Sequence, residues 1–403
     1  MGKPVKVRDA PGLRWISRAN GRFVARWQCR TDVRKAGFPV KSVKLWEGVE
    51  PTKEEWDFIA DTCVSLQQEM LVFSRGGLPV SVEFDGTLTS LMLHYRTDPD
   101  SPFKKLRYHS KVYYETLMGL IERDHGAQQL TELKGRLFRR WHEAWAEGGK
   151  TAVAHGKIGM LRTLFSFGAS IMEDPECIRL KAIMSELRFE MPKARTERLT
   201  AEQAIAIRAM AHKKGRPSVA LAQAFQFELM LRQKDVIGEW VPMSEPGVSD
   251  THRGKLKWLR GIRWEEIDQN MVLRHVTSKR QKLITVDLKN APMVMEELAL
   301  IERKASGPII VNEADELPWK TVRFRLWWRS CADACGVDKK VRNMDSRAGG
   351  ITEATAAGAL LEHVQQAATH SDISMTQRYS RGSEEKIANV QQLRIQHRNK
   401  TKT

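Results

Sequence analysis

Short runs of alternating apolar and polar residues dominate the amino-terminal part of the chain. Residues 13–18 and 22–27 are rich in aromatic and β-branched side chains and flank Asn20 and Gly21, a pair that favours a hairpin turn. Residues 40–46 alternate apolar with basic positions. The pattern predicts a small sheet of three strands.

A helical period replaces this alternation after Thr52. Thr52 and Glu55 have the spacing of a capping box, in which each side chain accepts a hydrogen bond from the other residue's backbone N–H. Glycine and proline at 76–79 end the unit. The apolar positions that step by three and four along this predicted helix are Trp56, Ile59, Cys63, Leu66 and Met70.

Residues 83–186 keep helical spacing throughout, so an all-helical domain is expected there. One apolar stripe recurs every four residues, and Arg136, Arg139 and Arg140 fall on the opposite face. The stripe consists of Leu133, Leu137, Trp141 and Trp145.

A polar and basic stretch at 187–199, which contains Pro192, indicates a linker between domains. Thr200 and Gln203 then form a second capping box. Beyond this point the sequence mixes helical and alternating periods. It predicts helices at 218–238, 291–304, 320–335 and 346–357, strands at 259–264, 271–277 and 283–288, and an inserted surface loop at 242–257.

These patterns predict a multidomain protein. We expect a small α+β amino-terminal domain at 1–78, an all-α domain at 79–190, and a mixed α/β, mostly helical domain at 191–403. A chain of 403 residues is long enough for several separate hydrophobic cores.

The chain is strongly basic, with a formal net charge of +17 and a pI of about 9.7. A globular protein with this excess of positive charge typically binds a polyanion, most often nucleic acid. The five cysteines lack the paired spacing of a metal site, so reduced thiols are expected. No run reaches the roughly 18 apolar residues that a membrane span needs, and no apolar signal region is evident, so a soluble cytoplasmic protein is expected.

Basic residues gather in three regions where contacts with DNA are expected. The alternatives are an ordinary α+β domain and helix faces whose charges are simply solvated. The candidates are Arg18, Arg22, Arg26, Lys41 and Lys44 in the predicted sheet, Lys104, Lys105 and Arg107 in the helical domain, and Arg195 in the linker.

The last quarter of the chain carries the most informative set of polar residues. Arg347, His370 and Tyr379 follow one another at separations of 23 and 9 residues, and Arg232 lies upstream. Two guanidiniums, an imidazole and a phenol are the groups needed to hold a phosphodiester and attack it without a metal ion.

This set resembles the active site of the tyrosine recombinase (phage integrase) family, at motif level over residues 200–382. Residues 232–236 match the family's Arg-x-x-Glu-Leu motif, with Asp235 in place of the usual glutamate. The family's lysine lies in a hairpin and matches Lys279 best, with Lys282 as the competing candidate.

The resemblance implies a role for each of these residues. Tyr379 would attack the scissile phosphorus, forming a 3′-phosphotyrosyl link and releasing a 5′-hydroxyl. Arg232 and Arg347 would hold the non-bridging oxygens, His370 would donate a hydrogen bond to the phosphate, and Lys279 would protonate the leaving oxygen. Neither a cofactor nor a metal ion is implied.

One position departs from the family pattern. The second arginine usually lies in His-x-x-Arg, and here the first residue of that motif is Met344. A thioether cannot donate a hydrogen bond to phosphate. One alternative is therefore a catalytically weakened, integrase-like DNA-binding regulator. A second is a type IB topoisomerase, against which the separate basic amino-terminal sheet argues.

The resemblance also implies partners and a biological setting. Residues 1–78 would bind arm-type DNA sites, residues 79–190 the core site, and residues 191–403 would catalyse cleavage. The expected partners are double-stranded attachment-site DNA, three further copies in a homotetramer on DNA, an excision or directionality factor and a host DNA-bending protein. The setting would be the nucleoid of a bacterial cell that carries a phage or other mobile element. The tail after Tyr379 would dock on a neighbouring subunit or on its own domain.

Overall fold

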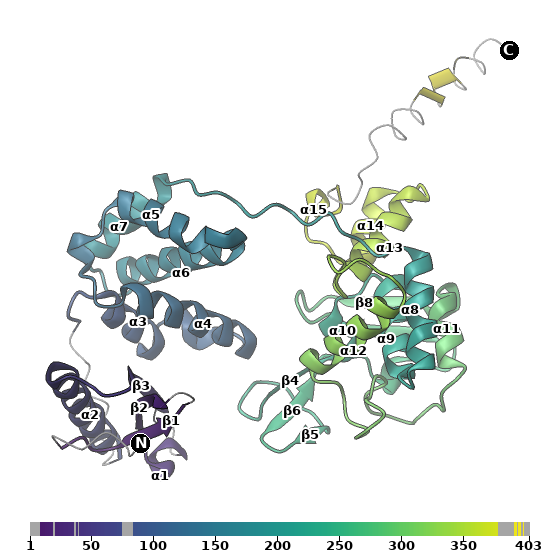
Figure 1. The fold of residues 1–403 in the computed structure, drawn as a ribbon. Helices are drawn as coiled ribbons and strands as arrows, with labels where there is room; N and C mark the ends of the chain where they lie inside the picture. Colours follow the sequence, from purple (N-terminus) through teal and green to yellow (C-terminus); the bar gives the residue numbers. More distant parts are fainter. Residues whose placement is uncertain are drawn as a thin grey trace. The chain divides into compact units, whose positions relative to one another are not determined.

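The computed structural model describes residues 9–18, 21–35, 38, 40–74, 84–377, 391, 392, 394, 395 and 398. The chain divides into two compact units, residues 1–192 and 193–403, whose elements can be followed in Figure 1. None of the helices in the described ranges combines the length and apolar character that a membrane crossing requires.

The first described segment is the predicted three-stranded antiparallel sheet. Its strands are β1 (Leu13–Ser17), β2 (Phe23–Gln28) and β3 (Ser42–Gly48), with β2 in the centre. The short helix α1 (Thr31–Lys35) follows β2, and the long helix α2 (Lys53–Ser74) packs against the sheet.

Aromatic side chains hold this sheet and α2 together. The ring of Trp15 makes edge-on contacts with those of Trp46 and Trp56, at centroid distances of 6.0 and 5.7 Å. The capping box at the start of α2 is confirmed, because Thr52 N–H donates to Glu55 Oε2 at 2.7 Å and Glu55 N–H donates to Thr52 Oγ1 at 3.2 Å.

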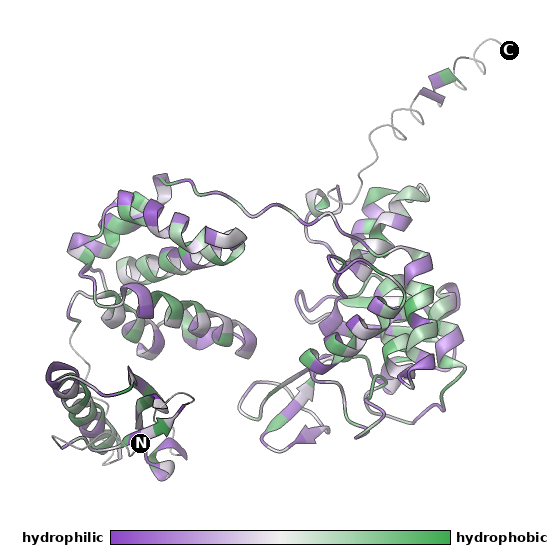
Figure 2. Cartoon of the chain, in the orientation of Figure 1, coloured by the Kyte–Doolittle hydropathy of each residue, from purple (hydrophilic) through white to green (hydrophobic). Residues whose placement is uncertain are grey.

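Residues 84–186 form the predicted helical region around α6. Its helices are α3 (Leu88–Thr97), α4 (Tyr108–His125), α5 (Gly135–Ala146), α6 (Thr151–Ser170) and α7 (Pro175–Glu186). Of the predicted stripe, Leu133, Trp141 and Trp145 are buried and Leu137 is partly buried, although Leu133 lies before α5, and the three arginines of α5 are exposed. Figure 2 shows hydrophilic and hydrophobic residues alternating along these helices.

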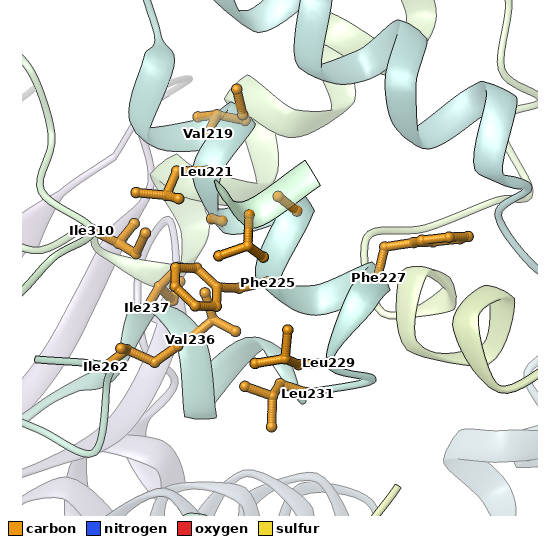
Figure 3. Packing of buried hydrophobic residues seen from close by; sticks show 14 of the residues in the cluster. Val219, Leu221, Phe225, Phe227, Leu229, Leu231, Val236, Ile237, Ile262 and Ile310 are labelled. Carbon is orange, nitrogen blue, oxygen red and sulfur yellow. The ribbon is translucent and has the colours of Figure 1, made fainter. Parts of the chain in front are cut away.

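The second unit is built around α9 (Pro217–Glu228). Residues 219–227 of this helix are buried on every side. The helices that pack against it are α8 (Ala201–Lys213), α10 (Gln233–Ile237), α11 (Pro292–Leu298), α12 (Thr321–Ala334) and α13 (Asp345–Ala356). Figure 3 shows Phe225 facing Val236 and Ile237, whereas Phe227 points away from them.

The described part of this unit also contains two small sheets and two further helices. Strands β4 (Glu239–Pro242), β6 (Leu256–Leu259) and β5 (His252–Arg253) form one sheet in that order, and β7 (Val272–Val276) pairs with β8 (Leu283–Asp287) in a hairpin. Helices α14 (Leu361–Ala367) and α15 (Ile373–Gln377) follow α13.

Several sequence predictions for this unit were wrong in detail. The predicted helix at 218–238 is two helices, because Met230 adopts a left-handed φ of 51° between α9 and α10. The helix predicted at 291–304 ends at Leu298. The stretch at 242–257 is a surface loop only in part, since it includes β5 and the start of β6.

The strand predicted at 259–264 is also wrong. Strand β6 ends at Leu259, Arg260 has a left-handed φ of 71°, and a short 3-10 helix spans Trp264–Glu266. The apolar residues of this stretch are buried around a turn, and the sequence alternation cannot distinguish that arrangement from a strand.

Candidate active site

The guanidinium of Arg347 is fixed between two backbone carbonyls. Arg347 lies in the first turn of α13 and is 8% exposed. Its Nη1 donates to the carbonyl of Met230 at 2.5 Å, and its Nη2 donates to the carbonyl of Ala368. Met230 and Thr369 both adopt left-handed φ values, of 51° and 53°. Such conformations cost non-glycine residues energy, so the surrounding contacts must hold these turns in place.

Two glycines bring α13 close enough for these contacts. An added Cβ at Gly349 would lie 2.0 Å from the carbonyl oxygen of Leu199, and one at Gly350 would lie 2.2 Å from that of Phe227. A methyl group does not fit at either distance. The glycines therefore let α13 pack directly on the backbone of α9 and of the segment before α8, which places Arg347 beside Met230.

Arg232 reaches the same turn from another direction. It is the residue before α10, and its Nη1 lies 3.4 Å from Oγ1 of Thr369 and 3.8 Å from Oδ2 of Asp235. The family motif predicted this arginine inside a helix. It lies at the start of a helix instead, because the left-handed backbone of Met230 interrupts the helix two residues earlier. Arg232 and Arg347 thus both contact the segment formed by Ala368 and Thr369.

His370 follows that segment directly and is also 8% exposed. Its Nδ1 lies 2.9 Å from Oγ1 of Thr376 in α15. Burial, together with the positive charges of Arg347 and Arg232, lowers the pKa of His370 to about 4. The imidazole is therefore neutral at pH 7 and suited to donate or accept one hydrogen bond at each ring nitrogen.

The turn of the β7–β8 hairpin is attached to this cluster at two points. Asp235 accepts a hydrogen bond from Ser278 N–H at 2.6 Å through Oδ1, and one from Arg232 N–H at 3.3 Å through Oδ2. Arg280 Nη2 donates to Oγ of Ser371 at 2.5 Å. Lys279 and Lys282 are both exposed in this turn, so both sequence candidates for the general acid lie on the element that meets the arginines.

Tyr379 lies outside the described residues. The described part of α15 ends at Gln377, and Thr376 within it is fully buried against His370. Met344 immediately precedes α13 and is 60% exposed.

The candidate DNA-binding residues differ in their surroundings. Arg18, Arg22, Arg26, Lys41 and Lys44 lie on the amino-terminal sheet or its flanks, and all but the half-buried Arg26 are exposed. The register places Arg14 opposite Arg26 and Arg26 opposite Lys44, which makes one row of three cations across the sheet. Arg14 was not among the DNA-binding candidates chosen from the sequence, because only the strand register shows that it lies in this row.

The remaining cations lie in the other two regions. Lys104, Lys105 and Arg107 are exposed around the short 3-10 helix Pro102–Lys105 and the start of α4. Arg195 is engaged by the second unit itself. Its Nη2 donates to Asp345 Oδ2 at 2.6 Å and to the carbonyl of Lys340 at 2.7 Å, and the bond with Asp345 raises the pKa of Arg195. Arg195 thus links the segment before α8 to the start of α13.

The described residues contain no group of three or more His, Cys, Asp or Glu side chains arranged to hold a metal ion. The cysteines are free thiols, and four of the five are buried. Burial raises the pKa of Cys63 to about 11, which leaves that thiol protonated at neutral pH.

Sequence reasoning missed the groups that position the site. Thr369, Thr376 and the carbonyls of Met230 and Ala368 contact the candidate residues, but a lone threonine or a backbone carbonyl gives no signal in a sequence. Among the positioning groups, only Asp235 could be recognised from the sequence, as the acidic member of the Arg-x-x-Glu-Leu motif.

The structure is similar to solved structures of integrases bound to DNA. A lambda integrase dimer bound to a COC′ core site matches with a TM-score of 0.56 at 17% identity, over 94% of this chain and 97% of that chain. A lambda integrase tetramer bound to a Holliday junction gives 0.55 at 14% identity, over 93% and 96%. Part of the Tn1549 transposon integrase in complex with circular intermediate DNA gives 0.54 at 12% identity, over 76% and 99%.

Neither the protein-family models nor the sequences of curated proteins give a match to this chain. The structural similarity shows that the chain has a tyrosine recombinase fold, as its motifs predicted.

Proposed function

We propose that this protein is a site-specific DNA recombinase of the integrase type, which cleaves and rejoins DNA strands through a phosphotyrosyl intermediate. The observation that carries the proposal is the convergence of Arg232 and Arg347 on residues 368 and 369, directly before His370, whose pKa both arginine charges lower. This convergence occurs within a fold shared with DNA-bound integrases.

The geometry supports a division of labour among these groups. The two guanidiniums carry fixed positive charge, and Arg347 is held by backbone carbonyls before any substrate arrives. Preorganised donors of this kind stabilise the charge that builds up on a phosphate in the transition state, and each is worth about 3 kcal/mol. His370, neutral and buried, adds a hydrogen bond without adding charge.

The chemical step exchanges one phosphoester for another. The phenolic oxygen of Tyr379 gives up its proton to solvent and forms a bond to phosphorus while the bond to the 5′ oxygen breaks. Lys279, or its neighbour Lys282, supplies the proton that the leaving oxygen takes up. The free energy of the ester is retained in the phosphotyrosyl link, so attack by a 5′-hydroxyl reverses the step without a cofactor.

We propose in the same way that the sheet at 1–78 binds arm-type DNA, that residues 79–190 bind the core site, and that four copies assemble on DNA. The solved lambda integrase tetramer on a Holliday junction supports that stoichiometry. The role would be integration and excision of a phage or other mobile element in a bacterial cell, with a directionality factor and a host DNA-bending protein as partners.

A nicked suicide duplex tests the chemistry. When the strand fragment beyond the cleavage site diffuses away, the covalent protein–DNA adduct accumulates and migrates as a slower band in a denaturing gel. We expect the adduct with the native chain and none with Tyr379→Phe. An adduct that persists in Tyr379→Phe contradicts the assigned nucleophile.

The exposed Met344 favours one alternative, a DNA-binding regulator that no longer cuts. The same assay separates the two functions. Specific binding to a duplex without adduct formation, on substrates that carry the protein's own binding site, supports the regulator.

A further inference from the structure

Helix α9 contains two buried amides among apolar residues. Gln223 and Gln226 are both fully buried, and they lie three residues apart on one face of the helix. Among the described residues, Nε2 of each has no hydrogen-bond partner. A buried donor without a partner destabilises a fold, whereas an apolar side chain of similar shape does not.

The side-chain oxygens of these glutamines are the ends of two hydrogen-bond chains. Gln226 Oε1 accepts from Asn343 Nδ2 at 2.8 Å, and Asn343 Oδ1 accepts from Gln233 Nε2 at 2.8 Å. Gln223 Oε1 accepts from Ser346 Oγ at 3.1 Å.

The direction of both chains is set by groups that can only donate. Arg325 Nε donates to Gln233 Oε1 at 3.0 Å, so the amide nitrogen of Gln233 must face Asn343, and that of Asn343 must face Gln226. Trp328 Nε1 donates to Gln223 Oε1 at 2.7 Å in the same way. Because Oε1 of Gln223 and of Gln226 must accept these bonds, Nε2 of each glutamine points away from its hydrogen-bond chain and is left without a partner in the described part of the protein.

These chains join the segments that carry the two arginines. Gln233 follows Arg232 directly, and Ser346 directly precedes Arg347. Asn343 is 5% exposed, and its backbone carbonyl accepts a hydrogen bond from Ser346 N–H at 3.1 Å. The buried face of α9 is therefore hydrogen-bonded to the start of α13 and, through Asn343, to the start of α10.

We propose that Gln223, Gln226, Asn343 and Gln233 are positioning residues that set the separation of the Arg232 and Arg347 guanidiniums so that both grip one phosphate. This inference rests on the recombinase function proposed above. A displacement of about 1 Å in such a pair is enough to slow a reaction about 100-fold. The chains hold the two segments together through interactions whose geometry is more directional than apolar packing.

Paired substitutions at Gln226 test this role. Gln226→Leu removes the acceptor for Asn343, whereas Gln226→Glu keeps an acceptor of the same length. With the suicide duplex at saturating concentration, we expect Gln226→Leu to slow adduct formation about 10- to 100-fold while its affinity for DNA changes less than about threefold. Gln226→Glu is expected to retain most of the rate.

Val219→Ala is the matched control, because it loosens the core at the amino-terminal end of the same helix, away from α10, without touching either chain. It is expected to lower the melting temperature and to leave the rate of the folded protein unchanged. If Gln226→Leu does not fold, Asn343→Ala breaks the same link from the α13 side and is expected to slow the adduct equally.

The possible failures are distinguishable. A native chain that forms no adduct overturns the proposed function. A native chain that forms the adduct, with Gln226→Leu or Asn343→Ala equally fast, overturns only the positioning role. A Gln226→Glu variant as slow as Gln226→Leu also overturns it.

Discussion

Oδ1 of Asp235 accepts a 2.6 Å hydrogen bond from the backbone N–H of Ser278, 43 residues away in the chain. The same carboxylate accepts the N–H of Arg232, so one buried side chain connects the start of α10 to the hairpin turn that carries Lys279. The acidic residue of the Arg-x-x-Glu-Leu motif therefore holds the hairpin turn with the general-acid candidate close to Arg232, the arginine that we propose binds phosphate.

Asp235→Ala is expected to impair both stability and cleavage. It leaves two backbone donors without their acceptor, at about 1–3 kcal/mol for each donor that stays buried. Urea denaturation measures the loss in unfolding free energy, and the suicide duplex measures the rate. Asp235→Glu, which restores the acceptor, should recover much of the rate. A rate in Asp235→Ala that matches the native protein would show that the turn does not need this tether.

Gly350→Ala is expected to displace α13 and with it Arg347. The new methyl group would lie 2.2 Å from the carbonyl oxygen of Phe227, so the helix has to move outward. We expect a loss of about 1–3 kcal/mol in unfolding free energy, as for an overpacked core, and a large fall in adduct formation. Gly159→Ala is the control, since nothing lies within 4 Å of its added Cβ and alanine favours the helix by roughly 1 kcal/mol. If Gly350→Ala and Gly159→Ala show the same stability and the same rate of adduct formation, the close approach at Gly350 does not position α13.

Local signals in the sequence predicted much of the fold. The capping boxes at Thr52 and Thr200 and the alternating strands of the first sheet each depend on residues a few positions apart, and these are present, whereas the strand predicted at 259–264 is not. The break at Met230 was not predictable, because methionine rarely adopts a left-handed φ and does so here only within the contacts around Arg347.

The candidate site could be predicted from the sequence as a set of residues, whose catalytic roles stay predictions, but not as an arrangement. The order of Arg232, Arg347 and His370 indicated a phosphate-binding chemistry, and the structure brings these three together. The groups that orient them are backbone carbonyls and neutral side chains far away in the chain. Arg195 illustrates the limit, since its sequence context indicated DNA whereas its partner is Asp345, 150 residues later.

His370 makes stability depend on pH in the acid range. Its folded pKa of about 4 lies below the ordinary value of 6.5, so between these values the unfolded chain binds more protons than the folded protein. Stability is therefore complete above about pH 6.5 and falls as the pH drops towards 4, by on the order of 3 kcal/mol in total. Thermal unfolding of the native chain and of His370→Gln across this range measures the contribution of His370 to stability. Identical pH slopes for the two proteins would contradict it.

Met344→His is expected to raise the cleavage rate. Met344 is 60% exposed immediately before α13, so an imidazole fits there without disturbing the core. It would supply a hydrogen-bond donor where the methionine has none. Single-turnover adduct formation measures the effect, and Met344→Leu is the control for side-chain size. A rate for Met344→His equal to or below the native rate removes the idea that Met344 is a handicap.

The row of Arg14, Arg26 and Lys44 is expected to bind DNA phosphates. Arg14 and Arg26 face one another across the sheet and repel, so an anion that lies between them relieves this repulsion, whereas Lys44 already pairs with Glu47 at 2.5 Å. Arg14→Ala and Arg26→Ala should each weaken duplex binding, and the slope of log affinity against log salt should become less steep by about 1 for each phosphate that the variant no longer neutralises. Fluorescence anisotropy over a salt series measures both quantities. Arg30→Ala is the control in the same domain, because Arg30 pairs with Asp32 at 2.6 Å. If Arg26→Ala keeps the native affinity and salt slope, the row does not bind the backbone.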